Sequence, residues 1–276
     1  MEISLNDFLF AFGLTLFAGL STSVGAAIAF FAKHTNTKLL TGSLGFSAGV
    51  MIYISLVEIF FKAKNELTEA TSPATGYWLT IVGFFAGMGI IALIDKLVPE
   101  YENPHEMRPL EETADSIDLP VHRDSKGQLY RMGMFAALAI AIHNFPEGLA
   151  TFTGALKDPS LGISIAIAIA IHNIPEGIAV SVPIYYATAS RKKAFFYSSL
   201  SGLSEPVGAL VGYLLLMPFM NEVVFGLLFS SVAGIMVFIS LDELLPAAEK
   251  YGEHHVSMYG VVTGMIVMAV SLALFA

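Results

Sequence analysis

The chain has 276 residues, of which 14 are Lys or Arg and 23 are Asp or Glu. Charged residues make up 13% and hydrophobic residues 55% of the chain. An ordinary soluble domain is about a quarter charged, so this composition excludes both a soluble globule and a disordered chain. The net charge of −9 argues against nucleic-acid binding through a basic surface. The class that remains is an all-α polytopic membrane protein whose surroundings are a lipid bilayer.

Long intervals with almost no charge define the predicted membrane spans. Each interval holds the ~20 apolar residues that a helix needs to cross a bilayer. Eight such spans are predicted, at residues 7–30, 39–61, 76–98, 130–156, 160–186, 194–218, 223–246 and 256–275.

The distribution of Lys and Arg predicts the orientation of these spans. Loops that follow odd-numbered spans hold 11 of the 14 basic residues, and the other loops hold 3. Because positive charge marks the cytoplasmic side, we expect both termini on the extracytoplasmic side. Residues 1–276 are expected to form a single transmembrane domain. The polar stretch at 100–128 is predicted to be a mobile cytoplasmic loop, because it is rich in charge and contains three prolines.

A short motif occurs twice, on the fourth and fifth predicted spans. The segment IAIHNFPEGLA at 140–150 recurs as IAIHNIPEGIA at 169–179, with nine of eleven positions identical. Consecutive spans run in opposite directions. The two helices are therefore expected to carry the same polar cluster at the same depth.

A second repeat connects spans two and seven. AGVMIYISLVEI at 48–59 resembles AGIMVFISLDEL at 233–244, with seven of twelve identities. These spans are expected to run in opposite directions, and such similarity is typical of the inverted-topology repeats of secondary transporters. Spans one to three and six to eight would then form two halves around spans four and five. A chance match between aliphatic helices is the alternative.

The duplicated motif has the chemistry of a metal site. His143 and Glu147 lie at i and i+4, about 40° apart on one helix face, so both can reach the same ion. Pro146 cannot donate to the carbonyl group of Ile142, which is left free as an acceptor. Imidazole and carboxylate together favour zinc, iron, cobalt or manganese.

The second helix repeats these ligands as His172, Asn173 and Glu176, and the first also carries Asn144. Span six adds Glu205. A carboxylate within the bilayer costs about 2.5 kcal/mol or more unless its charge is compensated. Glu147, Glu176 and Glu205, which lie in otherwise uncharged spans, therefore indicate a functional site. The alternative is that each His and Glu simply form a hydrogen-bonding pair between helices.

Other polar residues carry weaker signals. Met51, near the middle of span two, is either a soft ligand or ordinary packing. Glu58 and the acidic pair Asp242 and Glu243 lie near span ends and either line a vestibule or extend to the interface. Four histidines outside the spans, His105, His122, His254 and His255, are expected to be solvated rather than metal ligands.

With HNFPEG at 143–148 and HNIPEG at 172–177, the chain resembles the ZIP (Zrt/Irt-like) metal transporters, and in particular their bacterial ZupT-type branch. SLDELLPAA at 240–248 and GEHH at 252–255 support the resemblance, which extends over the whole chain.

The resemblance implies a 3+2+3 arrangement of eight spans and a binuclear centre. One site would use His143, Glu147, His172 and Glu176. The other would use Asn144, Glu147, Asn173, Glu176 and Glu205, and Met51 matches a position that contributes to the site in some relatives. It further implies uptake of Zn²⁺, and also of Fe²⁺, Mn²⁺ and Co²⁺, into the cytosol by alternating access, with no resident cofactor.

Two other functions are weighed against a carrier in the bacterial inner membrane. An intramembrane metallohydrolase would use a metal-bound water, but the H-x-x-x-E spacing differs from the H-E-x-x-H arrangement in which a glutamate serves as base. A passive divalent channel would differ by a flux that does not saturate. Three GxxxG pairs leave a homodimer open, although such pairs more often join helices within one bundle.

Overall fold

The computed structural model describes residues 4–31, 37–97, 125–250 and 254–275. These residues form helices and no strand, which confirms the all-α prediction for this part of the chain. The elements, in order, are α1 (Leu5–Phe31), α2 (Thr37–Ile54), η1 (Ser55–Ile59), α3 (Phe60–Ala70), α4 (Pro73–Leu97), α6 (Ser125–Lys157), α7 (Pro159–Thr188), α8 (Arg191–Gly202), α9 (Ser204–Leu216), η2 (Met217–Phe219), α10 (Glu222–Ile239), η3 (Ser240–Leu244), α11 (Leu245–Lys250) and α12 (His254–Phe275).

Seven helical segments of the described residues are long and apolar enough to cross a membrane. They coincide with seven of the predicted spans, so the chain is an integral membrane protein with several spans. The remaining predicted span, 130–156, lies within α6, which is 33 residues long but is not among the seven. The count of eight spans and their 3+2+3 grouping stay predictions.

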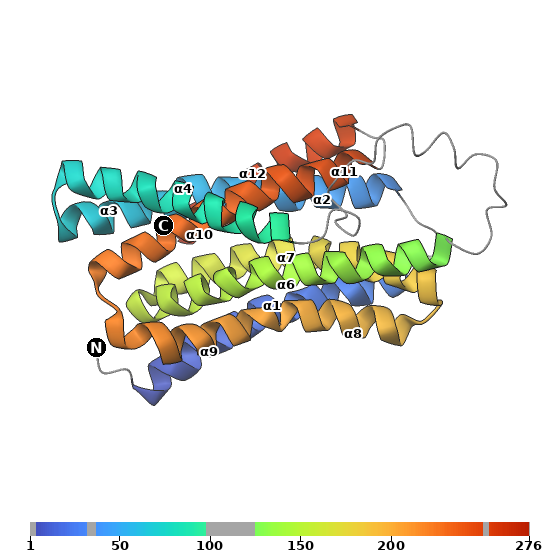
Figure 1. The fold of residues 1–276 in the computed structure, drawn as a ribbon, viewed down its shortest axis with the longest axis horizontal. Helices are drawn as coiled ribbons and strands as arrows, with labels where there is room; N and C mark the ends of the chain where they lie inside the picture. Colours follow the sequence, from blue (N-terminus) through green and yellow to red (C-terminus); the bar gives the residue numbers. More distant parts are fainter. Residues whose placement is uncertain (1–3, 32–36, 98–124, 251–253, 276) are drawn as a thin grey trace.

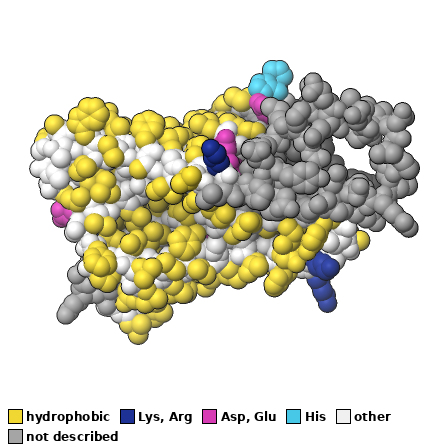
Figure 2. All heavy atoms as spheres, viewed as in Figure 1, with side chains coloured by type: hydrophobic (Ala, Val, Ile, Leu, Met, Phe, Trp, Pro, Cys, Tyr) yellow, Lys and Arg dark blue, Asp and Glu magenta, His cyan; other side chains and the backbone are white. Residues whose placement is uncertain are grey.

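The outer surface matches this assignment. Large apolar side chains point outward along the helices, as Trp78, Phe85 and Leu214 do with 67%, 63% and 69% of their surface exposed. Figure 2 shows one face on which hydrophobic side chains predominate and charged side chains are few. An apolar surface of this extent is expected where lipid, not water, covers the protein.

The ends of the helices follow local sequence rules. Asp158 begins α7, and its carboxylate accepts hydrogen bonds from the backbone N–H groups of Ser160 and Leu161. Pro159 occupies the first turn, where its missing N–H is not needed. At the other end Ala189 adopts a left-handed conformation with φ of 52° and ends the helix. Asp158 and Pro159 thus place the turn between α6 and α7 at the point that the charge pattern predicts.

The helices run roughly along the long axis of the molecule (Figure 1). The antiparallel pair α6 and α7 lies at the centre, with α1 packed on α7 and α9 packed on α6. On the other side α2 packs on α12 and α4 packs on α10. The polar motifs of α6 and α7 are therefore enclosed by other helices.

The predicted repeat of spans two and seven has a structural counterpart. Each segment contains one π-helical turn, η1 and η3, beginning at Ser55 and at Ser240. The Ser55 hydroxyl donates to the carbonyl oxygen of Met51 over 2.6 Å, and the Ser240 hydroxyl donates to that of Met236 over 2.7 Å. The similarity of the two segments thus includes their local irregularity, which favours a repeat over a chance match.

The three GxxxG pairs pack against other helices of the same chain. A methyl group on Gly87 would collide with the carbonyl of Ser231 in α10, and one on Gly264 with that of Phe46 in α2. The third pair, which includes Gly208, approaches α6 at Phe145. The glycines therefore serve contacts inside the bundle, and they no longer count as a signal for a homodimer.

Candidate metal centre

Two histidine–glutamate pairs join α6 to α7 at their polar motifs. His143 Nε2 lies 3.3 Å from Glu176 Oε1, and His172 Nε2 lies 3.2 Å from Glu147 Oε2. Each histidine thus meets the glutamate of the other helix. The i, i+4 spacing predicts that His and Glu of one helix share a face. In the structure, the carboxylate closest to each histidine comes from the other, antiparallel helix of the pair.

The two asparagines connect this pair of helices to their neighbours. The Asn173 amide donates to the carbonyl oxygen of Ala18 in α1 over 3.0 Å and also to the carboxylate of Glu205 in α9. The Asn144 amide donates to the carbonyl oxygen of Ser201 in α8 over 3.5 Å. Helices α1, α8 and α9 therefore enclose the motifs, and Glu205 joins the cluster as predicted.

All of these side chains are removed from solvent. The exposed fraction is 1% for His143 and 0% for the other members of the cluster, which are Asn144, Glu147, His172, Asn173, Glu176 and Glu205. Several of their polar atoms have no hydrogen-bond partner among the described residues. Among these atoms are Oε1 of Glu147, Oε2 of Glu176, Oε2 of Glu205, and Oδ1 of Asn144 and Asn173.

Buried carboxylate and amide oxygens without partners are costly, because each forgoes the hydrogen bonds it would make in water. A divalent cation binds such oxygens directly and offsets their negative charge. The unpartnered oxygens are therefore what a cation-binding cluster requires, whereas a purely structural pair of helices would satisfy them by hydrogen bonding. This observation favours the metal site over the alternative of simple interhelical pairs.

The distances within the pairs suit one tetrahedral zinc ion. Zinc binds imidazole nitrogen and carboxylate oxygen at about 2.0–2.2 Å, so two of its ligand atoms lie about 3.4 Å apart. The observed separations of 3.2 and 3.3 Å are close to that value. Yet in the described part of the chain no group of three His, Asp or Glu side chains is placed to hold one ion. Each pair therefore offers two ligands, and the remainder would come from amide oxygens or from reoriented carboxylates.

Glu243 is an addition that the sequence did not assign to the cluster. Its carboxylate oxygen Oε2 lies 3.9 Å from His143 Nδ1, and the side chain is only 7% exposed. Asp95 and Asp242 are close enough to act on it electrostatically. The expectation that Glu243 lines a vestibule or extends to the interface is thus replaced by a buried position beside His143.

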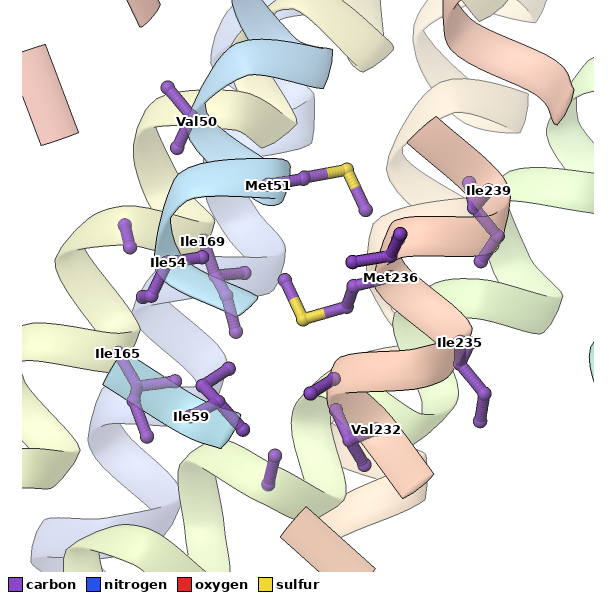
Figure 3. Close-up of a cluster of buried hydrophobic side chains, with 14 of the residues drawn as sticks. Val50, Met51, Ile54, Ile59, Ile165, Ile169, Val232, Ile235, Met236 and Ile239 are labelled. Carbon is purple, nitrogen blue, oxygen red and sulfur yellow. The ribbon is translucent and has the colours of Figure 1, made fainter. Parts of the chain in front are cut away.

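Met51 lies in an apolar environment. It is fully buried in a hydrophobic cluster with Met236, and Figure 3 shows the two side chains extending toward each other between α2 and α10. No described contact joins Met51 to the His and Glu side chains. Its role as a soft ligand stays a prediction.

The sequence predicts four further histidines to be solvated. His254 and His255 are exposed at the start of α12, and His254 Nδ1 contacts Glu249 Oε1 at 2.8 Å. The structure thus agrees that these two side chains are solvated. His105 and His122 fall in residues 98–124, outside the described part of the chain. Most of the predicted loop 100–128 falls there too, but its last four residues, 125–128, are wrong as a loop because they form the first turn of α6.

Comparison with known proteins gives consistent matches. The family model described as ZIP Zinc transporter matches residues 99–272. A protein named Zinc transporter ZupT from Lysinibacillus sphaericus is 65% identical over 98% of both chains. Proteins of the same name from Oceanobacillus iheyensis and Clostridium perfringens are 62% and 60% identical, over 99% of this chain and 100% and 98% of theirs.

Proposed function

Because the chain belongs to the ZIP zinc transporter family, we propose that it is a secondary carrier that takes up divalent metal cations into the cytosol. Zinc is the main substrate, and iron, manganese and cobalt are further substrates, since imidazole, carboxylate and amide ligands accept all four. The family consists of transporters, so the reading as a metallohydrolase is not retained.

The observation that carries the proposal is the pair of reciprocal His–Glu contacts between α6 and α7, with unpartnered carboxylate oxygens at zero exposure. In the proposed binuclear site, His143, Glu147, His172 and Glu176 hold one cation. Asn144, Asn173 and Glu205 hold a second cation together with both motif glutamates. Glu147 and Glu176 then bridge the two ions, so that two dications offset three carboxylates.

The way these helices pack suggests which part of the protein moves. The ligands come from α6, α7 and α9, and α1 packs closely on α7. We propose that these helices, with α8, move together against α2, α3, α4, α10 and α12, which carry none of the seven proposed ligands. Such a motion would expose the cation first to one side and then to the other, which is alternating access. A saturating flux with counter-transport would distinguish this carrier from a channel.

The proposal includes a location. The protein would lie in the bacterial inner membrane, with both termini on the extracytoplasmic side, as the Lys and Arg distribution predicts. A homodimer is not required, because every proposed ligand comes from one chain.

The proposal is tested with Glu176→Ala in a bacterial host that lacks its own zinc uptake systems. We expect zinc accumulation to fall to the level of the empty host, with normal amounts of protein in the membrane. Glu69→Ala is the matched control, because Glu69 is exposed at the end of α3, and it should accumulate zinc like the parent. Undiminished uptake by Glu176→Ala would overturn the proposal.

A further inference from the structure

Spans one and six contain a repeat that includes Glu205. GLSTSVGA at 19–26 matches GLSEPVGA at 202–209 at six of eight positions. The two differences are Thr22 in place of Glu205 and Ser23 in place of Pro206. Thr22 is therefore the counterpart of the glutamate that joins the proposed metal centre.

The contacts repeat with the sequence. Asn173 donates to the carbonyl of Ala18 and Asn144 donates to that of Ser201, and Ala18 and Ser201 occupy matching places one residue before the repeat. The two asparagine amides thus donate to equivalent positions, one beside each of the two repeated segments. The centre has an approximate internal two-fold symmetry, in which α1 and α9 exchange places as α6 and α7 do.

Close helix approaches follow the same symmetry. A methyl group on Gly25 would collide with the carbonyl of Ile174, and one on Gly208 with the carbonyl of Phe145, which matches Ile174 in the motif. Methyl groups on Gly19 and Gly202 would each collide with the other's carbonyl oxygen. The symmetry axis therefore passes near these last two glycines, one turn from Thr22 and Glu205.

Thr22 has an unusual hydroxyl group. The side chain is fully buried, and its Oγ1 has no hydrogen-bond partner. Buried threonines in helices commonly donate to the carbonyl four residues back, as Thr15 does to Ala11 over 3.0 Å. For Thr22 that carbonyl belongs to Ala18, which instead accepts from the Asn173 amide and from the Ser21 hydroxyl.

The position of Thr22 is next to the proposed ligands. A methyl group on Gly177, the residue after Glu176, would collide with the Thr22 carbonyl. A methyl group on Gly202 would lie 2.8 Å from both Cβ and Oγ1 of Thr22. Two other buried hydroxyls without partners, on Thr41 and Ser257, belong to α2 and α12, which do not carry the ligands.

We propose that the Thr22 hydroxyl is a further oxygen ligand of the transported divalent cation and acts with Asn144 as Glu205 acts with Asn173. This inference rests on the proposed function. Oδ1 of Asn144 and Oγ1 of Thr22 are both buried and have no partner among the described residues. Both residues lie at the same turn of α8, Asn144 at Ser201 and Thr22 at Gly202, so a cation held there would satisfy both atoms. Because the hydroxyl is neutral where Glu205 is ionisable, this half of the centre carries less negative charge and holds the cation more weakly.

The proposal predicts an effect on selectivity. Hydroxyl and amide oxygens are hard ligands that suit Mn²⁺ better than the softer Cd²⁺. Removal of the hydroxyl should therefore impair the binding of manganese more than that of cadmium. A purely structural role of Thr22 would change both to the same extent.

The test compares zinc uptake by Thr22→Val and Thr22→Ser in proteoliposomes, with manganese and cadmium as competitors. Thr22→Val keeps the shape of the side chain and should raise the KM for zinc about five-fold, and manganese should compete less well while cadmium competes as before. Thr22→Ser should restore both properties. Thr15→Val is the matched control, because Thr15 is buried on the same helix with its hydroxyl already satisfied.

An unchanged KM in Thr22→Val, or a fall in maximal rate alone, would overturn the assignment of Thr22 while leaving the carrier in place. If Thr22→Val is poorly inserted, Thr22→Ala takes its place with the same expectations. Absence of zinc uptake by the parent protein would instead contradict the proposed function itself.

Discussion

The close packing of α1 on α7 is predicted to hold the metal centre together, and Gly25→Ala tests this. The new methyl carbon would lie 1.9 Å from the carbonyl oxygen of Ile174 and 3.1 Å from the Cα of Gly177, the residue next to Glu176. Non-bonded heavy atoms prefer separations of about 3.5 Å, so the helices must separate by roughly 1 Å or more. Such overpacking costs about 1–3 kcal/mol.

A loss of this size corresponds to a fall in Tm on the order of 5 °C for a chain of this length. Tm is measured on the detergent-solubilised protein, and zinc uptake is measured in proteoliposomes at equal protein content. We expect both to fall, because Glu176 moves with the backbone of α7. Gly13→Ala is the matched control on the same helix, since nothing lies within 4 Å of its added methyl group. Equal Tm and equal uptake in Gly25→Ala and Gly13→Ala would refute the reasoning.

Three further substitutions test individual residues. Glu205→Gln removes a buried charge at nearly constant volume, so the KM for zinc should rise at least ten-fold, equivalent to about 1.4 kcal/mol. The control is the exposed Glu222→Gln, which should have the KM of the parent protein. A parental KM in both variants would exclude Glu205 as a ligand. Met51→Leu conserves volume in an apolar cluster, so zinc uptake should stay within about two-fold; a selective loss of cadmium uptake would instead identify Met51 as a soft ligand. The double variant His105→Ala, His122→Ala should take up zinc normally, and reduced uptake would place the loop in the metal path.

The sequence predicts the class of fold and the ligands because both depend on strong local signals. Charge is so unfavourable in the bilayer that its absence outlines the spans, and a buried glutamate stands out against that background. The motif His143 to Glu147 occurs twice, which makes coincidence implausible. Burial of all seven motif and span-six residues agrees with this reasoning.

Which side chains come into contact depends on how the helices pack against one another. No local sequence pattern specifies that packing. The i, i+4 rule joins His143 to Glu147, whereas the structure places His143 beside Glu176 and Glu243. These contacts follow from the antiparallel pairing of α6 with α7 and from the position of η3. The span within α6 is not among the seven helices that are apolar enough to cross a membrane, although α7, with the same polar motif, is one of them.

Internal symmetry was the least visible feature. Residues 19–26 and 202–209 are similar in sequence, but Thr22 stands where the other segment has Glu205. The pattern of charged residues therefore does not reveal the similarity. The repeated contacts of Asn144 and Asn173 and the matching close approaches of Gly25 and Gly208 give the two segments equivalent places.

The central claim is that the buried His–Glu cluster carries zinc across the membrane. It is tested most directly by zinc entry into proteoliposomes that contain purified protein and an enclosed zinc-sensitive dye. The parent should give saturating zinc entry that speeds up when the vesicles are preloaded with zinc, and Glu176→Ala should give none. Equal zinc entry with the parent and with Glu176→Ala would contradict the account.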